Sequence, residues 1–296
     1  MRHEGHNGEH PSHSGYGRRT KALSLRDSFD EATGLTFRRF FFDDDDALRC
    51  MKMLAAIRAG YNRRSIAALA LLVSSYGLVI AVWSDLFDFS TSDWLFTGVW
   101  IAMSAILCFR VDARRDVPRV FVGLVGGLAI EAWGTVTELW TYSTHERPPF
   151  WIVPAWPVAT LAIDRVARIV ELVLPRHADR FVTPILAWFA LQMTWFARAT
   201  LASPATWLVC AAMVVVVATT RNRRQDLALF LGGGMLGVFL EYWGTSRGCW
   251  TYWTHEVPPP IAACAHGFAS VAFQRVIEFT GRLRALMRNR LPLHAS

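Results

Sequence analysis

Two acidic side chains, each inside an apolar run, are the residues of this chain best placed to do chemistry. Glu131 opens the stretch EAWGTVTELWTYSTHERPP, and Glu241, 110 residues further on, opens EYWGTSRGCWTYWTHEVPP. The two stretches agree at 12 of 19 positions. A carboxylate facing lipid inside a membrane is unfavourable by roughly 2.5–3.5 kcal/mol, so both should face the interior of a helix bundle, where an ionisable residue indicates function. We predict that both are catalytic.

Aromatic residues recur around each acid. Their matched positions are Trp133, Trp140 and Tyr142 in the first stretch, and Trp243, Trp250 and Tyr252 in the second. Trp and Tyr anchor helix ends in any membrane protein, but anchoring does not explain why Trp-Gly-Thr recurs beside the acid. An acid among aromatic faces could protonate an alkene and stabilise the resulting carbocation by cation–π attraction. We predict that these six residues bind the substrate.

His145 and His255 follow in the outer loops, each before a Glu and a Pro pair. One interpretation is a divalent-metal site built from two His and up to four Glu. The other is a loop in which His and Glu bond the backbone and Pro-Pro starts the next helix. Because no HExxH or bridging spacing is present, we predict no metal and no cofactor, and assign both His as proton relays at the outer mouth.

Arg165 and Arg275 match across the two halves, on the apolar segment that follows each acid. At 1.5 Å per residue, Arg165 should lie about 9 Å deeper than Glu131, which makes a direct ion pair with that Glu doubtful. An arginine at this position either extends its side chain to the cytoplasmic headgroups or anchors a polar group of the substrate inside the bundle. We include both as candidate substrate-binding residues.

The composition indicates a membrane protein, with 53% hydrophobic residues and 13 Trp in 296 residues. The five Cys form no CxxC pair, which argues against a disulfide framework or a zinc site. Because a membrane span needs about 20 residues, we predict about eight transmembrane helices in an all-α polytopic protein. The apolar segments are 65–84, 94–109, 118–140, 150–170, 182–199, 205–220, 226–245 and 259–280.

Arginine placement sets the expected orientation. With both termini in the cytoplasm, 16 Arg fall in inner connections and three, Arg147, Arg198 and Arg247, in outer ones. The positive-inside rule therefore predicts a bacterial cytoplasmic (inner) membrane protein with both termini inside. The net charge of +7 then reflects topology and anionic headgroups, so no nucleic-acid partner is expected.

The chain should divide into a tail, a surface helix and two repeats. The predicted parts are a disordered cytoplasmic tail over 1–45, an interfacial amphipathic helix over 46–62, and parallel four-helix repeats over 63–175 and 176–296. The third helix of each repeat is Gly-rich before its acid, in GLVGGLAIE and LGGGMLGVFLE. Small residues allow close backbone approach, so we expect the two third helices to pack together and to place Glu131 and Glu241 in one pocket.

One spacing pattern in the first half is similar to that of a known family. It consists of a Glu, two further residues and a Gly, followed by a Trp and Tyr pair and then by a helix that begins at Pro. Its residues are Glu131, Gly134, Trp140, Tyr142 and Pro154, with Trp156 on the next helix. This pattern resembles the membrane-bound carotenoid biosynthesis proteins, which include carotenoid hydratases and are loosely similar to small-subunit lycopene cyclases. The resemblance implies acid-initiated chemistry on a polyisoprenoid alkene without a redox cofactor.

The function that follows is a membrane-embedded enzyme performing acid-type chemistry on an isoprenoid or other lipid. Two alternatives stay open: a proton- or ion-coupled transporter, in which the Glu pair binds a cation, and a non-catalytic membrane assembly subunit. The oligomeric state is left open. Between the acids, Glu131 is expected to matter more, because Trp151 and Trp156 follow it where Ile261 and His266 follow Glu241.

Overall fold

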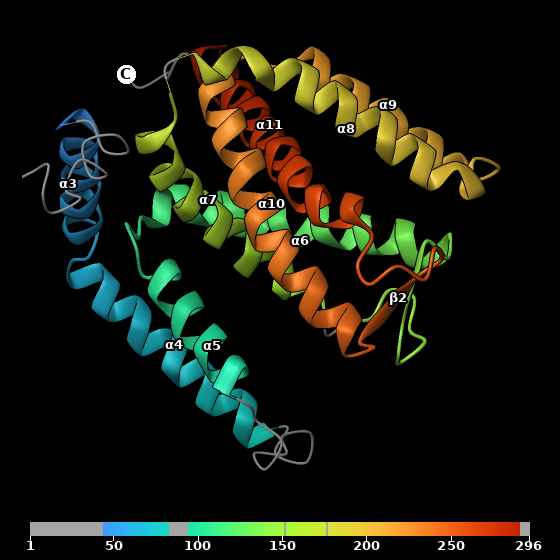
Figure 1. Cartoon of the computed structure of the whole chain (residues 1–296), viewed down its shortest axis with the longest axis horizontal. Helices are drawn as coiled ribbons and strands as arrows, with labels where there is room; N and C mark the ends of the chain where they lie inside the picture. Colours follow the sequence, from blue (N-terminus) through green and yellow to red (C-terminus); the bar gives the residue numbers. More distant parts are fainter. Residues whose placement is uncertain (1–43, 83–93, 151, 176, 291–296) are drawn as a thin grey trace, which may run out of the picture. The chain divides into compact units, whose positions relative to one another are not determined.

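The computed structural model describes residues 44–82, 94–150, 152–175 and 177–290. This part of the chain is mostly helical, with two three-residue strands (Figure 1). The helices are α3 (Asp44–Ala59), α4 (Arg63–Val82), α5 (Trp94–Leu107), α6 (Ala113–Val136), α7 (Ala155–Val173), α8 (Val182–Phe196), α9 (Pro204–Ala218), α10 (Arg223–Ser246) and α11 (Pro260–Arg290). The strands are β1 (Trp140–Tyr142) and β2 (Trp250–Tyr252), and the 3₁₀ turns are η2 (Ala178–Phe181) and η3 (Ala197–Thr200).

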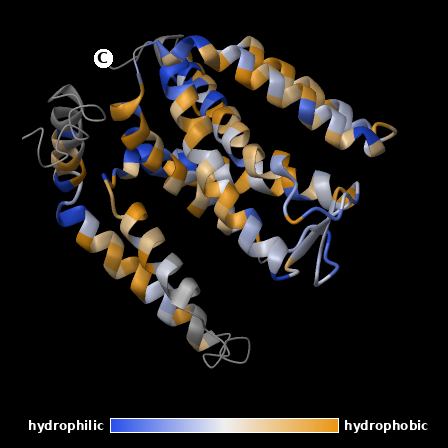
Figure 2. Cartoon of the chain, in the orientation of Figure 1, coloured by the Kyte–Doolittle hydropathy of each residue, from blue (hydrophilic) through white to orange (hydrophobic). Residues whose placement is uncertain are grey.

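Each of the eight predicted apolar segments coincides with one of the helices α4 to α11. Among the described residues, α6 and α10 are long and apolar enough to cross a membrane, and α9 is apolar but shorter. Figure 2 shows hydrophobic residues along these helices and hydrophilic ones where α10 begins and α11 ends. The predicted helix positions are therefore confirmed, whereas eight spans stay a prediction.

The chain divides into two units, Met1–Lys52 and Met53–Ser296. The predicted tail lies outside the described residues except for its last two positions. Helix α3 occupies most of the predicted surface helix at 46–62, but its placement on a membrane stays a prediction. Helices α4 to α11 and both strands belong to the second unit.

The two acid-bearing helices, α6 and α10, begin and end in matching ways. Each starts with a capping side chain: Asp112 accepts from the backbone N–H of Arg114, and Asn222 from that of Gln225. Such caps satisfy backbone donors that have no partner inside the helix. Both helices stop at a residue with left-handed backbone two positions after the last helical one, Glu138 (φ 59°) and Gly248 (φ 66°). These turns lead directly into β1 and β2.

Helices α6 and α10 do not pack along each other, so that expectation was wrong. Each packs instead on both α7 and α11, which makes a four-helix arrangement in which the two acid-bearing helices are separated. Gly127 of α6 faces the Trp156 side chain of α7, and Gly237 of α10 faces the backbone of α11 at Ala263. Small residues permit a close approach, but they do not specify which helix makes it.

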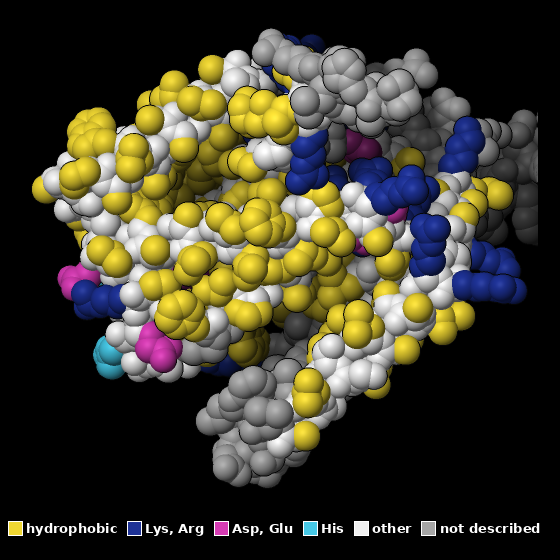
Figure 3. Space-filling model, turned by 180° about the vertical axis from the view of Figure 1, so that it is seen from behind, with side chains coloured by type: hydrophobic (Ala, Val, Ile, Leu, Met, Phe, Trp, Pro, Cys, Tyr) yellow, Lys and Arg dark blue, Asp and Glu magenta, His cyan; other side chains and the backbone are white. Residues whose placement is uncertain are grey.

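The remaining helices extend this arrangement, with α8 and α9 side by side and α8 against α10 and α11. Phe189 of α8 stacks on Phe268 of α11 with ring centroids 4.6 Å apart, and this pair lies in the main hydrophobic core. The outer faces remain apolar: Leu191, Trp195 and Leu208 are each at least 66% exposed. On the face drawn in Figure 3, hydrophobic side chains predominate and the surface is hollowed. Apolar surface of this extent marks an interaction with membrane or partner.

Candidate functional site

Glu131, near the C-terminal end of α6, is 4% exposed. Its Oε2 accepts hydrogen bonds from the Trp140 indole N–H at 3.0 Å and the Tyr142 hydroxyl at 2.9 Å. Its Oε1 accepts from the Trp156 indole N–H of α7 at 3.0 Å. Hydrogen bonds to an ionised carboxylate are stronger than those between neutral groups. Three donors therefore replace the water that this carboxylate loses on burial.

Glu241 occupies the equivalent place on α10 and is 6% exposed. Its Oε2 accepts from the Trp250 indole N–H at 3.0 Å and from the Tyr252 hydroxyl at 2.8 Å. The third partner differs, because His266 Nε2 of α11 lies 3.0 Å from Oε1. Trp156 and His266 are themselves 110 residues apart in the chain. The two carboxylates thus have the same surroundings apart from one side chain.

The recurring Glu-x-Trp-Gly-Thr sequence has a local explanation in both helices. A β-carbon at Gly134 would overlap the Trp140 ring, and one at Gly244 would overlap the Trp250 ring. The glycine therefore leaves space for the Trp ring that bonds the acid one helical turn earlier. The Thr that follows each glycine donates its hydroxyl to the backbone carbonyl of the acid, at 2.6 Å in both cases.

Strands β1 and β2 pair antiparallel and join the two halves of the site. Trp140 lies opposite Tyr252, Thr141 opposite Thr251, and Tyr142 opposite Trp250. The aromatic rings of the outer pairs are in contact, with centroids 6.0 and 5.9 Å apart. Each ring that donates to one carboxylate therefore packs on a ring that donates to the other.

Both carboxylates line one cavity of about 330 Å³. Seven Trp and Tyr side chains share its wall: Trp133, Trp140, Tyr142, Trp156, Trp243, Trp250 and Tyr252. A second cavity of about 380 Å³ is lined by apolar side chains of α6, α8, α9 and α11, including Phe121, Val209 and Phe273. It shares four lining residues with the first: Ile130, Trp133, Met193 and Ala265. The expected shared pocket therefore exists, and it adjoins an apolar chamber.

The two tyrosines that bond the acids are held in their protonated form. Burial, and then the neighbouring Glu131, raise the pKa of Tyr142 well above its usual value. Burial and Glu241 raise the pKa of Tyr252 in the same way. A raised tyrosine pKa favours the neutral hydroxyl, so both remain hydrogen-bond donors through the physiological pH range.

The predicted relay histidines lie apart from this cavity. His145 and His255 are exposed, adopt left-handed backbone (φ 58° and 59°) and donate their backbone N–H to the carbonyls of Tyr142 and Tyr252. Neither lines the cavity. Within the described ranges, no group of three or more His, Cys, Asp or Glu could hold a metal ion. The structural interpretation of these loops thus accounts for their geometry, and the relay role stays a prediction.

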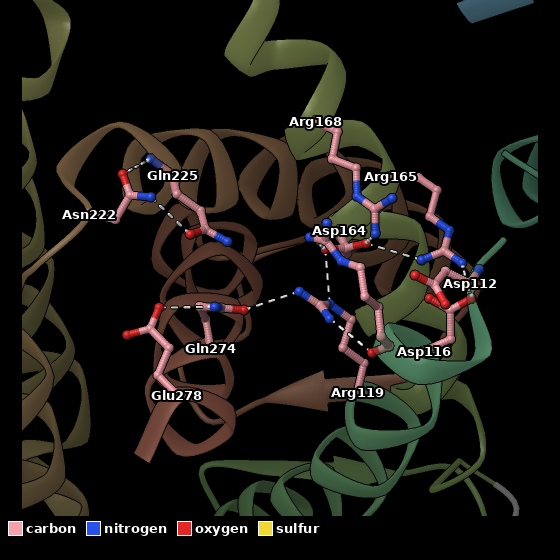
Figure 4. A network of polar contacts seen from close by, with 11 residues as sticks. Asp112, Asp116, Arg119, Asp164, Arg165, Arg168, Asn222, Gln225, Gln274 and Glu278 are labelled. Carbon is pink, nitrogen blue, oxygen red and sulfur yellow. Dashed lines mark hydrogen bonds and ion pairs between the residues drawn. The ribbon is translucent and has the colours of Figure 1, made fainter. Parts of the chain in front are cut away.

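Arg165 and Arg275 also lie away from the cavity, in buried ion pairs with the N-terminal ends of the acid-bearing helices. Figure 4 shows the pair made by Arg165. Arg165 is 1% exposed and donates to Asp116 of α6 at 2.6 Å and to Asp164 at 3.0 Å. Arg275 donates in the same manner to Asp226 of α10. The Arg165 side chain is therefore committed to buried carboxylates, and the two arginines join α7 to α6 and α11 to α10.

Asp164 is the centre of the larger network in the first half. It also pairs with Arg119 at 2.9 Å and with Arg168. Arg119 reaches Gln274 of α11 at 3.3 Å, which links the two halves at this end. Figure 4 shows these side chains converging from α6, α7 and α11.

Sequence reasoning left two direct partners of the acids out of the site. Trp156 entered through the family-like pattern and as a difference between the halves, and His266 only as that difference, so neither was assigned to the site. The 110-residue offset relates them, so aligning the halves beyond the Pro pair would have proposed both. Trp151 lies outside the described residues.

No protein-family model, curated protein or solved structure matches this chain.

Proposed function

We propose that this protein is an integral membrane enzyme that performs acid-type chemistry on an isoprenoid or other lipid bound between Glu131 and Glu241. The observation that carries the proposal is that both buried carboxylates line one aromatic-walled cavity beside a wholly apolar one. An apolar chain fits the apolar chamber. Its reacting double bond would then lie among the carboxylates and the Trp and Tyr faces.

The aromatic wall suits the intermediate that such chemistry forms. A proton added to an alkene leaves a positive charge on carbon, which aromatic faces and carboxylates attract. Trp133 belongs to both cavities, so a substrate passing from one chamber to the other meets its ring. No redox cofactor is part of this proposal, because protonation of an alkene transfers no electrons to or from the protein.

The proposed setting is a bacterial inner membrane with eight spans in two parallel four-helix repeats and both termini in the cytoplasm. The spanning capacity of α6 and α10 and the exposed apolar faces of α8 and α9 support it. Matched hydrogen-bond sets around the two acids support the repeat. The paired strands β1 and β2 agree with a twofold relation, because their register is symmetric about Thr141 and Thr251.

An ion-coupled transporter is the second candidate, since two carboxylates in one cavity could bind a cation. The hydrogen bonds disfavour it, because the four carboxylate oxygens are already hydrogen-bonded to indole, phenol and imidazole groups. A cation would have to displace these donors to be coordinated.

The test begins with the lipid extract of the protein purified in detergent, analysed by mass spectrometry. An isoprenoid or lipid enriched over the bulk membrane extract is expected, whereas enrichment of no apolar ligand would contradict the proposal.

Chemistry is tested in D₂O with the protein in nanodiscs and squalene as the probe alkene. Protonation of a double bond followed by loss of a different proton leaves deuterium on carbon. We expect labelling by the wild type, and a loss of about 10²- to 10⁴-fold in Glu131→Gln or Glu241→Gln. Glu138→Gln is the control, since Glu138 is exposed and pairs only with Arg147 among the described residues. Equal labelling by all four proteins would overturn the catalytic role.

A further inference from the structure

The two carboxylates differ in one hydrogen-bond partner, which is Trp156 for Glu131 and His266 for Glu241. This difference gives the two acids different roles. We infer that Glu241 and His266 form the proton-transfer pair of the cavity, whereas Glu131 is a fixed anion that stabilises positive charge. The inference rests on the proposed function for its substrate, but not for the state of the two acids. It reverses the expectation that Glu131 is the more important proton donor.

Among the described residues, the hydrogen-bond donors to the Glu131 carboxylate include no group that exchanges protons at ordinary pH. Two of its three donors are indole N–H groups, those of Trp140 and Trp156, and an indole nitrogen only donates. The third is the hydroxyl of Tyr142, which keeps its proton. The two indole bonds can only point toward the carboxylate, so these two favour its ionised form.

Glu241 has the same Trp and Tyr donors but an imidazole in place of the third. His266 Nε2 lies 3.0 Å from Oε1, and an imidazole nitrogen can either donate or accept. One proton can therefore lie on either side of this bond, as N–H donating to a carboxylate or as O–H donating to imidazole. His266 Nδ1 is buried and has no hydrogen-bond partner among the described residues, so the ring is not committed to a second group.

The His266 ring is held in place for this exchange. It stacks on Trp156 with centroids 5.7 Å apart and an interplanar angle of 17°, so the two equivalent side chains meet face to face between the acids. The other titratable groups that line the cavity are Glu131, Tyr142, Tyr252 and Cys249. None of them is a base that carries positive charge. His266 is accordingly the group of the cavity that can lower its negative charge.

The chemical step balances without a further reactant. The π electrons of the alkene take the proton of the Glu241–His266 pair and form a C–H bond, which leaves positive charge on the neighbouring carbon. That charge faces the Glu131 carboxylate and the Trp rings. The pair then recovers a proton, either from an adjacent carbon as a double bond re-forms or from a water molecule that adds its oxygen to the cation.

The first test asks which acid holds a proton, with no substrate present. Infrared difference spectra of the protein in nanodiscs are recorded over a pH titration, and the C=O band of a protonated carboxyl is followed. We expect a buried band that is lost in Glu241→Gln, altered in His266→Gln and retained in Glu131→Gln. A band lost in Glu131→Gln and retained in Glu241→Gln would overturn the assignment.

The second test exchanges the one unmatched residue between the halves. His266→Trp copies the first half, where an indole already fits against α6, and should lower deuterium labelling of squalene by about 10²-fold or more. Trp156→His should create a second titrating carboxyl band at Glu131. His177→Trp, at an exposed position, is the matched control.

The outcomes separate the inference from the proposed function. Should His266→Trp fail to fold, His266→Gln serves instead, since its amide can still donate to Glu241. Wild-type labelling by a folded His266 variant would overturn the proton-transfer role. If the infrared band follows Glu241 but the wild type labels no squalene, the pair is supported and the isoprenoid substrate is wrong.

Discussion

Each buried carboxylate of the cavity depends on a tyrosine hydroxyl whose contribution can be separated from packing. An ion removed from water loses several kcal/mol of hydration, which its hydrogen-bond donors must replace. Tyr142 and Tyr252 each supply one such donor from a strand rather than from the helix that bears the acid. Each tyrosine hydroxyl therefore both fixes its strand to the acid-bearing helix and stabilises the negative charge of the carboxylate.

Tyr142→Phe and Tyr252→Phe should each destabilise the fold by about 1.5–3 kcal/mol, the usual value for a hydrogen bond to a charged group. The substitution removes one oxygen and leaves the ring contacts in place. Thermal unfolding in detergent, followed by near-ultraviolet circular dichroism, measures the effect. Tyr242→Phe is the matched control on α10, where Tyr242 is 63% exposed, and should change stability by less than about 0.5 kcal/mol. Equal shifts in all three proteins would show that the acids do not need these donors.

At this scale the sequence predicted much of the site, because its repetition marks the residues that act together. The two acids, their Trp and Tyr partners and the shared pocket were all expected. His145 and His255 recur as faithfully and yet lie in exposed loops. Repetition alone does not distinguish a residue that shapes a turn from one that faces a cavity. Both kinds of residue recur, because each copy of the motif must form the same turn and the same site.

Among the elements, the acid-bearing helices bring each acid to its Trp partner through a glycine that leaves room for the indole ring. Gly134 and Gly244 lie under the Trp140 and Trp250 rings, which must approach the helix surface to reach the acids. A methyl group at either position would push the ring away and break an N–H···O bond. The cost then combines steric overlap with a buried carboxylate that has lost a donor.

Gly134→Ala and Gly244→Ala should therefore destabilise the protein by about 1–3 kcal/mol, the usual cost of overpacking. Gly234→Ala on α10 is the control, because a β-carbon there would contact nothing within 4 Å. In that open position alanine is favoured over glycine by about 0.5–1 kcal/mol, so the control should gain stability. Melting temperatures of the three variants test the sign as well as the size. Stabilisation of all three would mean that the rings do not lie where the structure has them.

The ion pairs at the other ends of the same helices join α6 to α7 and α10 to α11. Asp226→Asn removes the nearer of the two carboxylates that pair with Arg275 among the described residues and leaves Glu278 at 3.9 Å, which should cost about 3 kcal/mol, the lower end of the range for breaking a buried pair. Denaturant unfolding in detergent measures this loss. Glu138→Gln, which breaks an exposed pair with Arg147, should cost no more than about 1 kcal/mol. A similar loss for both variants would contradict a structural role for the buried pair.

Helix positions followed from hydropathy, whereas helix partners did not. Apolar runs of about 20 residues locate α4 to α11 because length and composition are local properties. The contact of Gly127 with α7, and the pairing of β1 with a strand 110 residues away, depend on how segments meet in space. The strands are three residues long, and membrane anchoring already accounted for their Trp and Tyr. No local signal therefore distinguished them.

For the whole molecule, the arginines and the acids lie at opposite ends of the same helices. Helices α6 and α10 carry Asp116 and Asp226 in their first turns and the catalytic candidates near their last. The arginine-rich pairs gather at the first end, as the positive-inside rule would have it for a cytoplasmic face. Under the proposed topology, the acids and their cavity would lie in the outer half of the membrane.

This orientation predicts which surface residues a membrane-impermeant thiol reagent reaches in intact cells. In a background with the native cysteines replaced, Thr144→Cys, in the exposed loop after β1, should be labelled from outside. Arg221→Cys, at the exposed turn before α10, should be labelled only after the cells are permeabilised. A reporter fused after Ser296 should be active in the cytoplasm. The opposite labelling pattern would invert the proposed topology.

The short ribbon of β1 and β2 makes the two acids mechanically dependent on each other. Trp140 donates to Glu131 while its ring rests on Tyr252, which donates to Glu241, and Tyr142 and Trp250 repeat the relation in reverse. A substrate that displaces any one of these rings would weaken the hydrogen bonds to both carboxylates. We therefore expect a ligand bound beside one acid to change the hydrogen bonding of the other acid, even though the two helices that bear them do not pack together.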